Sequence, residues 1–318
     1  MTDAELLLRR ARRPLVLGMG GGGDVVGALA TAESMRVYDG ADPIVGGLTW
    51  ERRPIDPVPG PRAVDEIEGG EVLATGVMLA GPQTRVRGRD VLFAESRMAA
   101  FLNEPTVLVD ANLGPAAIAD GLARAAARLR RDLIVFVDVG GDVLGQGDEP
   151  GLRSPLCDAV MLAASERLRV AQHAVLLGIF GIGCDAELTA DEVLVRIAGV
   201  AAAGGLCGVR GLTEPVAERL ESAIDLVPTE ASAQAVRAFR GVSGLVTIRD
   251  GTRTLQLGPA AAQTFYLDVQ TTVSTAGRLA RAVAGASDLH AANSALRELG
   301  VVTELDAELD AWSALGGA

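Results

Sequence analysis

Short runs of apolar residues alternate with longer stretches of helical spacing over the first two thirds of the chain. The apolar runs, which predict buried strands, lie at residues 14–17, 106–109, 133–137 and 174–179. The stretches that follow carry apolar residues on one helical face and lie at residues 24–35, 115–131, 155–168 and 190–203. Continuous apolar strands that alternate with helices are typical of a parallel sheet covered on both faces. The pattern predicts an α/β fold, a Rossmann-like three-layer sandwich with a mostly parallel sheet.

The last third of the chain is less regular. Thr213 and Thr229 each stand where the N-cap of a helix is expected. Residues 245–257 contain two short apolar stretches around Asp250-Gly251, a dipeptide that favours a type I′ turn. We therefore expect a late antiparallel hairpin that adds strands to the sheet.

The end of the chain and the linker pattern bear on domain organisation. Residues 288–315 predict two helices that are broken at Gly300. The chain has 318 residues, with no internal repeat and no Gly/Ser-rich linker. At about 150 residues per domain two domains would fit, but one large α/β domain is equally compatible. We expect a single domain over residues 1–318, with a weak seam near residues 210–228.

Charge and missing residue types exclude several functions. The chain has 29 basic and 41 acidic side chains and a formal net charge of −12, so it lacks the basic excess of nucleic-acid-binding proteins. All 29 basic residues are arginine. Without lysine there is no Schiff-base anchor for pyridoxal phosphate and no P-loop lysine. Two histidines are too few for a His-rich zinc site.

The cysteines and the apolar stretches indicate a cytoplasmic location. Cys157, Cys184 and Cys207 are widely spaced and form no CxxC pair, which is typical of reduced thiols. Cys184 is either a nucleophile or, more simply, a small buried side chain. Arginine pairs near the N-terminus resemble a twin-arginine signal, but Asp24 and four glycines interrupt the apolar stretch that follows. No uninterrupted apolar run reaches the ~18 residues of a transmembrane helix, so no membrane partner is expected.

The first candidate binding element is a glycine-rich turn between the first strand and the first helix. Gly20, Gly21, Gly22 and Gly23 lead into Asp24 and form part of a GxGxxG pattern. Glycines let a ligand approach the backbone, and the N–H groups at a helix N-terminus favour an anion. Asp24 places a negative charge at that point, so NAD(P) is less expected than another small ligand. Alternatively, Asp24 only caps the helix.

Two later turns also combine glycines with carboxylates at the end of an apolar run. They contain Asp138, Gly140, Gly141 and Asp142 in the first turn, and Gly183, Asp185 and Glu187 in the second. In open α/β sheets, ligands bind at the carboxyl ends of the strands, where these turns are expected to meet. For each aspartate taken singly, helix capping is an equal alternative. Asp142 ranks first, because two successive glycines before it suggest that a ligand approaches the backbone.

A proline-rich loop is expected over residues 46–62. Four prolines between residues 54 and 61 exclude a helix or a central strand there. Such a stiff segment would fix Trp50, Glu51 and Arg53 as a wall of a binding pocket. The alternative is an ordinary surface loop.

Three segments together resemble the DUF1152 family. They are GGGGDVVGAL at residues 20–29, WERRPIDPVPGPR at residues 50–62 and DVGGD at residues 138–142. The resemblance extends over most of the chain. It implies a cytoplasmic α/β protein but supplies no activity and no catalytic residue.

The first functional hypothesis is an enzyme that acts on a small molecule at the carboxyl edge of the sheet. Its candidate catalytic residues are Asp138, Asp142, Asp185 and Glu187. Carboxylates gathered in a partly dry site either share a divalent cation or divide acid and base roles. Asp24 and Asp142 are the candidate ligands of Mg²⁺ or Mn²⁺.

The arginines and the reaction class complete this hypothesis. Arg53, Arg62 and Arg153 are candidates to bind an anionic group of the substrate. With no lysine and two histidines, carboxylates are the expected acids and bases. A metal-assisted hydrolase or a lyase fits this combination best.

Two other classes of function stay open. The GxGxxG turn supports a nucleotide- or NAD(P)-binding oxidoreductase. A non-enzymatic protein that binds a small ligand would use the same edge without needing its acids close together. Carboxylates more than ~10 Å apart would favour this last class. A homo-oligomer is compatible with each of them.

Overall fold

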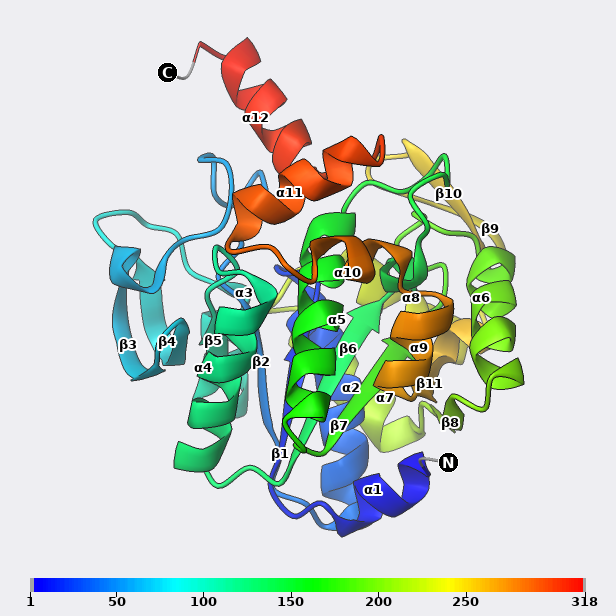
Figure 1. Cartoon of the computed structure of the whole chain (residues 1–318). Coiled ribbons are helices and arrows are strands. Elements are labelled where there is room, and N and C mark those ends of the chain that lie inside the picture. Colours follow the sequence, from blue (N-terminus) through cyan, green and yellow to red (C-terminus); the bar gives the residue numbers. More distant parts are fainter. Residues whose placement is uncertain (1–2, 317–318) are drawn as a thin grey trace.

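The computed structural model describes residues 3–316. Its largest sheet contains β1 (Pro14–Gly18), β2 (Ile44–Leu48), β3 (Ile67–Ala74), β4 (Val77–Val86), β5 (Thr106–Val109), β6 (Leu133–Val139), β7 (Val175–Phe180), β8 (Leu206–Gly211) and β11 (Gln263–Leu267). Their order across the sheet is β3-β4-β5-β2-β1-β6-β7-β11-β8. The sheet forms the middle layer of the molecule (Figure 1).

The five central strands are parallel. They follow one another as β5-β2-β1-β6-β7, which is the strand order 3-2-1-4-5 of the Rossmann fold. The order reverses between β1 and β6, so the segments that leave these two strands separate from each other at the carboxyl edge. Such a switch point is where ligands bind in open α/β sheets. The Rossmann-like prediction is confirmed.

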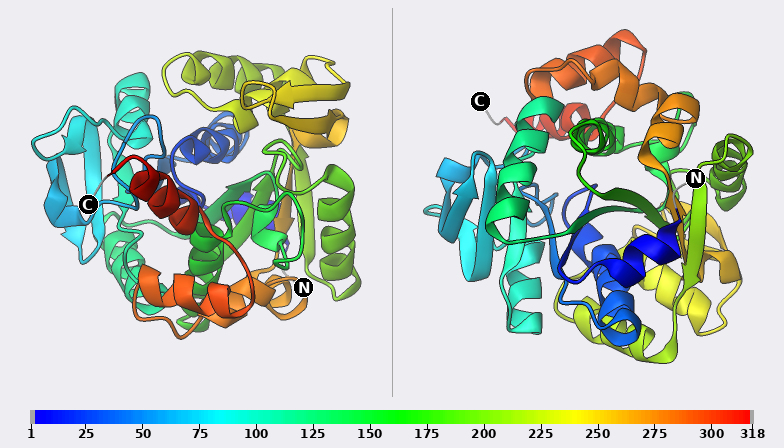
Figure 2. Two further views of the ribbon diagram at one scale, coloured as in Figure 1. Left: turned by 90° about the horizontal axis from the view of Figure 1, so that it is seen from above. Right: turned by 60° about the horizontal axis from the view of Figure 1, so that its bottom comes forward.

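Helices cover both faces of the sheet (Figure 2). One face packs against α1 (Ala4–Arg10), α2 (Asp24–Ser34), α3 (Ala94–Leu102), α7 (Glu214–Ile224) and α8 (Glu230–Phe239). The other packs against α4 (Pro115–Arg128), α5 (Pro155–Val170), α6 (Ala190–Ala202), α9 (Val269–Thr275), α10 (Arg278–Val283) and α11 (Leu289–Glu298). The last helix, α12 (Glu304–Ala314), lies beyond the carboxyl edge of the sheet.

The two apolar cores explain why the central strands read as uninterrupted apolar runs. Successive side chains of a strand point to opposite faces of its sheet. In β1, Leu15 and Leu17 belong to one core and Val16 to the other. In β6, Phe136 and Val137 divide in the same way. Because both faces are covered, the positions of these strands are apolar up to their carboxyl ends, where Asp138 of β6 is the exception.

The predicted late antiparallel hairpin is confirmed, but it does not add strands to the main sheet. β9 (Gly244–Ile248) and β10 (Arg253–Leu257) form a separate two-stranded sheet and do not join the main one. Ile248 pairs with Arg253, so the loop has four residues. Asp250 and Gly251 have φ angles of +53° and +82°, as a type I′ turn requires, and the Thr252 N–H donates to the Arg249 carbonyl at 3.1 Å. The carboxylate of Glu230 accepts the backbone N–H of Arg249 at 3.1 Å and so ties the hairpin loop to the start of α8. The antiparallel strand that the main sheet gains late in the chain is β11.

Three strands near the start of the chain lie outside the predicted pattern. β3 and β4 add an antiparallel hairpin to the β5 edge. β2 includes Gly46 and Gly47, which the sequence placed in the proline-rich loop. A Cβ atom on Gly46 would lie 2.3 Å from the backbone oxygen of Val107, so glycine is required there by close packing inside a strand. Within residues 3–316, no helix is long and apolar enough to cross a membrane.

Candidate functional site

A cavity of about 800 Å³ lies at the carboxyl edge of the sheet, over the switch point between β1 and β6. Its walls come from the glycine-rich turn after β1, the segment after β2, the turns after β6 and β7, and the start of α5. Residues 227–231 and the hairpin loop close one side, and α12 covers another. Segments far apart in the sequence therefore meet at one hollow.

The glycine-rich turn is closed by its own aspartate. Asp24 is the first residue of α2, and its Oδ2 accepts the backbone N–H of Gly20 at 2.9 Å. A Cβ atom on Gly20 would lie 2.6 Å from that oxygen, which explains the glycine. Burial raises the pKa of Asp24 to about 7, and the nearby Asp138 contributes. Gly20, Gly21, Gly22, Gly23 and Asp24 all line the cavity.

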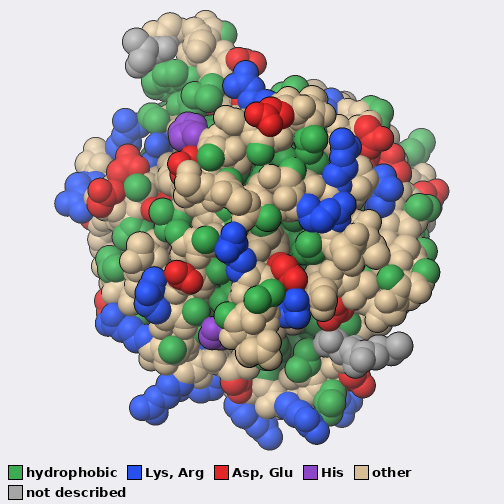
Figure 3. All heavy atoms as spheres, viewed as in Figure 1, with side chains coloured by type: hydrophobic (Ala, Val, Ile, Leu, Met, Phe, Trp, Pro, Cys, Tyr) green, Lys and Arg blue, Asp and Glu red, His purple; other side chains and the backbone are tan. Residues whose placement is uncertain are grey.

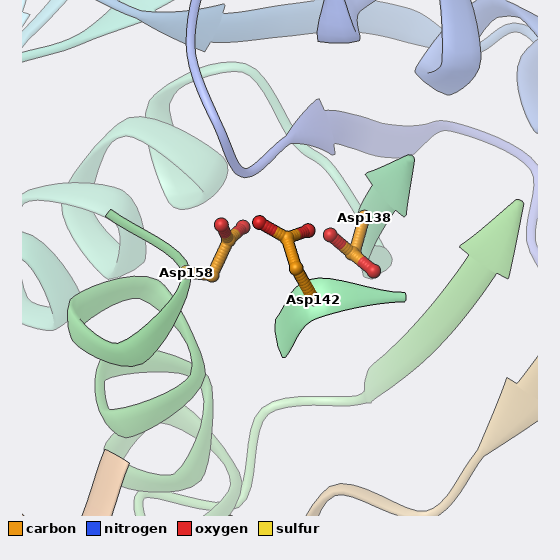
Figure 4. Close-up of side chains that lie close together, drawn as sticks. All are labelled: Asp138, Asp142 and Asp158. Carbon is orange, nitrogen blue, oxygen red and sulfur yellow. The ribbon is translucent and has the colours of Figure 1, made fainter. Parts of the chain in front are cut away.

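Three buried aspartates point toward one another at the site (Figure 4); Asp142 and Asp158 line the cavity, and Asp138 lies behind them. Asp138 comes from β6, Asp142 from the short helical turn Asp142–Leu144 and Asp158 from the first turn of α5. One oxygen of each lies within 4.8 Å of the other two. Both oxygens of Asp138 and Oδ1 of Asp158 are shielded from solvent and form no hydrogen bond within the described residues.

A second set of three carboxylates shares Asp142. One oxygen each from Asp142, Asp185 and Glu187 also lie within 4.8 Å of one another. The Oε2 atom of Glu187 accepts the backbone N–H groups of Arg153 and Ser154 at 2.7 and 2.8 Å. The hydroxyl of Ser154 donates to Oε1 of Glu187 at 2.7 Å and lies 3.5 Å from Oδ2 of Asp142. The structure thus brings all four predicted catalytic carboxylates together.

Burial and mutual repulsion disfavour the ionised forms of these acids. Burial raises the pKa values of Asp142, Asp158 and Asp185 well above the ordinary range, and the neighbouring carboxylates add to each rise. Burial also raises the pKa of Asp138 to about 7, although the Asp142 carboxyl and the backbone N–H groups of Gly141 and Val143, which lie near it without hydrogen-bond geometry, offset part of the effect. A cluster of buried carboxylates is therefore stabilised either by protons or by bound cations.

The glycines of the two later turns make room for side chains of the protein. Gly140 has a φ of +122°, and a Cβ atom there would lie 2.3 Å from the carboxyl carbon of Asp185. A Cβ atom on Gly141 would lie 2.7 Å from the methyl groups of Val193. Gly183 packs equally closely on the backbone of α6. Gly140, Gly141 and Gly183 do not line the cavity, so the close approach inferred from the sequence is that of Asp185 and Val193.

The proline-rich segment places its predicted residues differently. Glu51 lines the cavity, and burial raises its pKa to about 7. Arg53 lines the cavity too. Trp50 lies behind the wall with no exposed surface, and its Nε1–H donates to Glu308 at 3.0 Å. Arg62 is also buried behind the wall, where its Nε donates to Asp56 at 2.7 Å.

Several arginines face the cavity. Arg53 forms no ion pair or side-chain hydrogen bond within residues 3–316, and Nη1 of Arg97 is buried without a hydrogen-bond partner there. Arg253 approaches Glu187 with 3.4 Å between Nη1 and Oε1. The guanidinium of Arg153 lines the cavity and donates to the carbonyl of Leu152. Arg53 and Arg97 are therefore free to bind an anion.

Two important acids were missed from the sequence. Asp158 is the only charged residue between positions 155 and 165, and this isolation in an apolar helix was a readable signal. Glu304, at the start of α12, accepts the backbone N–H groups of Leu156 and Cys157 at 2.9 and 3.0 Å. It thereby satisfies the N-terminus of α5. Local sequence patterns cannot predict that Glu304, about 150 residues later in the chain, caps α5.

Cys184 is fully buried, and burial raises the pKa of its thiol. A buried thiol of this kind is not an activated nucleophile. The simpler interpretation of this residue, a small core side chain, agrees with its position.

Fold and site together define a Rossmann-like α/β protein with a carboxylate-rich cavity at the switch point of its sheet. The chain belongs to the DUF1152 family, whose model, described as "Protein of unknown function (DUF1152)", matches residues 15–312. No match was found among curated proteins or among solved structures.

Proposed function

We propose that the protein is an enzyme, a divalent-cation-dependent hydrolase or lyase that acts on a small anionic molecule. The observation that carries the proposal is Asp142, which two sets of buried carboxylates share at the switch point of the sheet. Dispersed acids would have favoured a simple binding protein, whereas these acids lie together.

The donor set suits a hard cation. Mg²⁺ and Mn²⁺ prefer carboxylate oxygens, and every member of both sets is an aspartate or a glutamate. Asp142 is a better ligand than Asp24, because Asp142 belongs to both carboxylate sets and Asp24 to neither. A cation in this position would supply Lewis acidity and lower the pKa of a bound water.

The protein's own groups would supply proton transfer. The pKa of Asp24 is raised to about 7, near neutral pH, where a general acid or base is most effective. Asp24 lines the cavity beside the carboxylate sets and is a side chain that could exchange a proton with a substrate. The acid–base role therefore falls to Asp24, and the cation-binding role to the deeper carboxylates.

An anionic substrate is supported by the arginines of the cavity. Arg53 and Arg97 have no carboxylate partner within 4 Å among the described residues, although they lie in the same cavity as the acids. A guanidinium group binds a carboxylate or phosphate through two parallel hydrogen bonds. We propose that they hold the anionic group while the carboxylates address another part of the molecule.

A small molecule fits better than a nucleic acid. Basic and acidic side chains are interspersed over the face drawn in Figure 3, and the chain carries a net charge of −12. The proposal includes a cytoplasmic location, with which the buried free thiols of Cys157 and Cys184 are compatible. A homo-oligomer is compatible with the proposal.

Geometry favours NAD(P) less than the sequence pattern does. The carboxylate of Asp24 takes the Gly20 N–H, at the helix terminus where a pyrophosphate would be expected. The space beside Gly23 is filled by Thr229. A thermal shift with NAD⁺ or NADP⁺ would restore this alternative.

The test is a comparison of wild type with Asp142→Asn. Each protein is incubated with a bacterial small-molecule extract and Mn²⁺, and the extract is followed by mass spectrometry. We expect wild type to consume an anionic metabolite, and EDTA or the substitution to stop it. Asp191→Asn, which changes an exposed acid of α6, is the matched control. Equal consumption by wild type and Asp142→Asn, or no consumption by either, would contradict the proposal.

A further inference from the structure

We infer that Asp142 bridges two divalent cations, so that the site is a dinuclear centre. This inference rests on the proposed function and makes it more specific. One cation would lie among Asp138, Asp142 and Asp158, and the other among Asp142, Asp185 and Glu187. Each set offers three ligand atoms within 4.8 Å of one another.

Unsatisfied oxygen atoms point to a ligand in the first set. Asp138 is 1% exposed and Asp158 is 2% exposed. Both oxygens of Asp138 and Oδ1 of Asp158 lack any hydrogen bond within the described residues. Buried polar groups of folded proteins nearly always have a partner. The two aspartates come from a strand and a helix, so one distorted loop does not account for both.

In the second set, hydrogen bonds hold both oxygens of Glu187, whereas Oδ2 of Asp185 stays open to a ligand within residues 3–316. Glu187 is fixed by the Arg153 and Ser154 N–H groups. Asp185 receives one hydrogen bond within residues 3–316, from the Glu187 N–H to Oδ1 at 3.1 Å. Backbone donors that orient acids in this way are typical of the shell around metal ligands.

The charge of the cluster matches two cations. Among the described residues, the only ion pair that reaches the five carboxylates joins Glu187 to Arg253. When ionised, the five acids and this arginine carry four net negative charges, which equal the charge of two divalent cations. A single cation would balance two of these charges, and two of the acids would have to stay protonated to avoid unpaired charge in a buried site.

Asp142 is placed to serve both cations. It belongs to both sets, and its Oδ2 lies 3.5 Å from Ser154 Oγ, on the side where Ser154 contacts Glu187. Asp138 and Asp158 belong to the first set only. A bridging carboxylate between cations ~3.5–4 Å apart is the usual architecture of two-metal enzymes, in which both cations contact the reacting group.

The test counts bound cations and measures whether they interact. Wild-type protein is stripped with EDTA and dialysed against Mn²⁺, and bound manganese is measured by mass spectrometry and electron paramagnetic resonance. We expect two Mn²⁺ per chain with a spin-coupled signal. Asp158→Asn and Asp185→Asn are matched variants, one from each set. Each should retain one uncoupled Mn²⁺ and bind the other at least ~100-fold more weakly.

Controls separate this inference from the proposed function. Asp191→Asn should retain two coupled ions, and melting temperatures show whether each variant is folded. One Mn²⁺ in wild type would overturn the dinuclear centre but not the proposed enzyme. No bound Mn²⁺ would overturn both. Two ions that persist in both Asp158→Asn and Asp185→Asn would show that the cations bind elsewhere, and would overturn the assignment.

Discussion

Two buried acids near the N-terminus of α5 have opposite environments. Glu304 is 6% exposed, and its oxygens accept two backbone N–H groups and approach Arg52. Asp138 is 1% exposed, and neither of its oxygens forms a hydrogen bond within the described residues. Glu304 and Asp138 are therefore similarly buried but differ in their hydrogen-bond partners. A carboxylate with partners holds the fold together, and one without partners awaits a ligand.

The largest expected effect is that of Asp142→Asn, which tests whether the acids without partners bind a cation. Asp142 is the carboxylate that both sets share. We expect the affinity for Mn²⁺ to fall by about 1,000-fold, or ~4 kcal/mol. The melting temperature without cation should stay equal or rise, because a source of repulsion is removed. Isothermal titration calorimetry and calorimetric melting provide the two measurements. Normal Mn²⁺ affinity together with early melting would mean that Asp142 is a structural residue.

Glu304→Gln and Asp138→Asn test the contrast directly. Removing the charge of Glu304 weakens hydrogen bonds to two backbone N–H groups and to Arg52, so the free energy of unfolding should fall by about 2 kcal/mol. Asp138→Asn should not destabilise the cation-free protein. Chemical denaturation of both variants gives the comparison. An equal loss in the two variants would remove the distinction between them.

The pH dependence of stability tests whether the buried acids hold protons in the folded protein. The pKa values of Asp24, Glu51 and Asp138 are raised to about 7, whereas acids of an unfolded chain titrate near ~4. Between these values the folded protein holds protons that the unfolded chain has lost. Its stability should therefore fall as pH rises from ~4 to ~7, and the acids whose pKa values are raised further, such as Asp142, should continue the fall at higher pH.

This dependence is measured as the melting temperature in EDTA between pH 5 and pH 8. We expect a fall of roughly 5 °C. Mn²⁺ should reduce the fall, because cations replace the protons, and Asp24→Asn should flatten the curve. A melting temperature that rises over this range would contradict the raised pKa values.

The smallest expected effect concerns the residue that the sequence placed in the pocket wall. Trp50→Phe removes the hydrogen bond to Glu308 and should cost about 1 kcal/mol of stability. Because Trp50 lies behind the wall, the affinity for Mn²⁺ should stay within twofold of wild type. A large loss of Mn²⁺ affinity would show that Trp50 contributes to the site.

The central parallel sheet and four carboxylates of the site could be predicted from the sequence for the same reason. Continuous apolar strands end at one edge, so Asp138, Asp142, Asp185 and Glu187 could be placed together from their position after those strands. The strand hairpin β3–β4 could not be predicted, because its exposed face and glycines break the alternation expected of a strand. The roles of Trp50 and Arg62 depend on partners that only the folded chain brings near.

The cap on α5 also orders events during synthesis. Every carboxylate of the cluster is translated by residue 187, whereas Glu304 is added far later. Until that residue leaves the ribosome, the first N–H groups of α5 lack their partner and one wall of the cavity is missing. The nascent chain thus carries a full set of acids before it carries the helix that encloses them. The site can therefore be enclosed only after α12 has been synthesised.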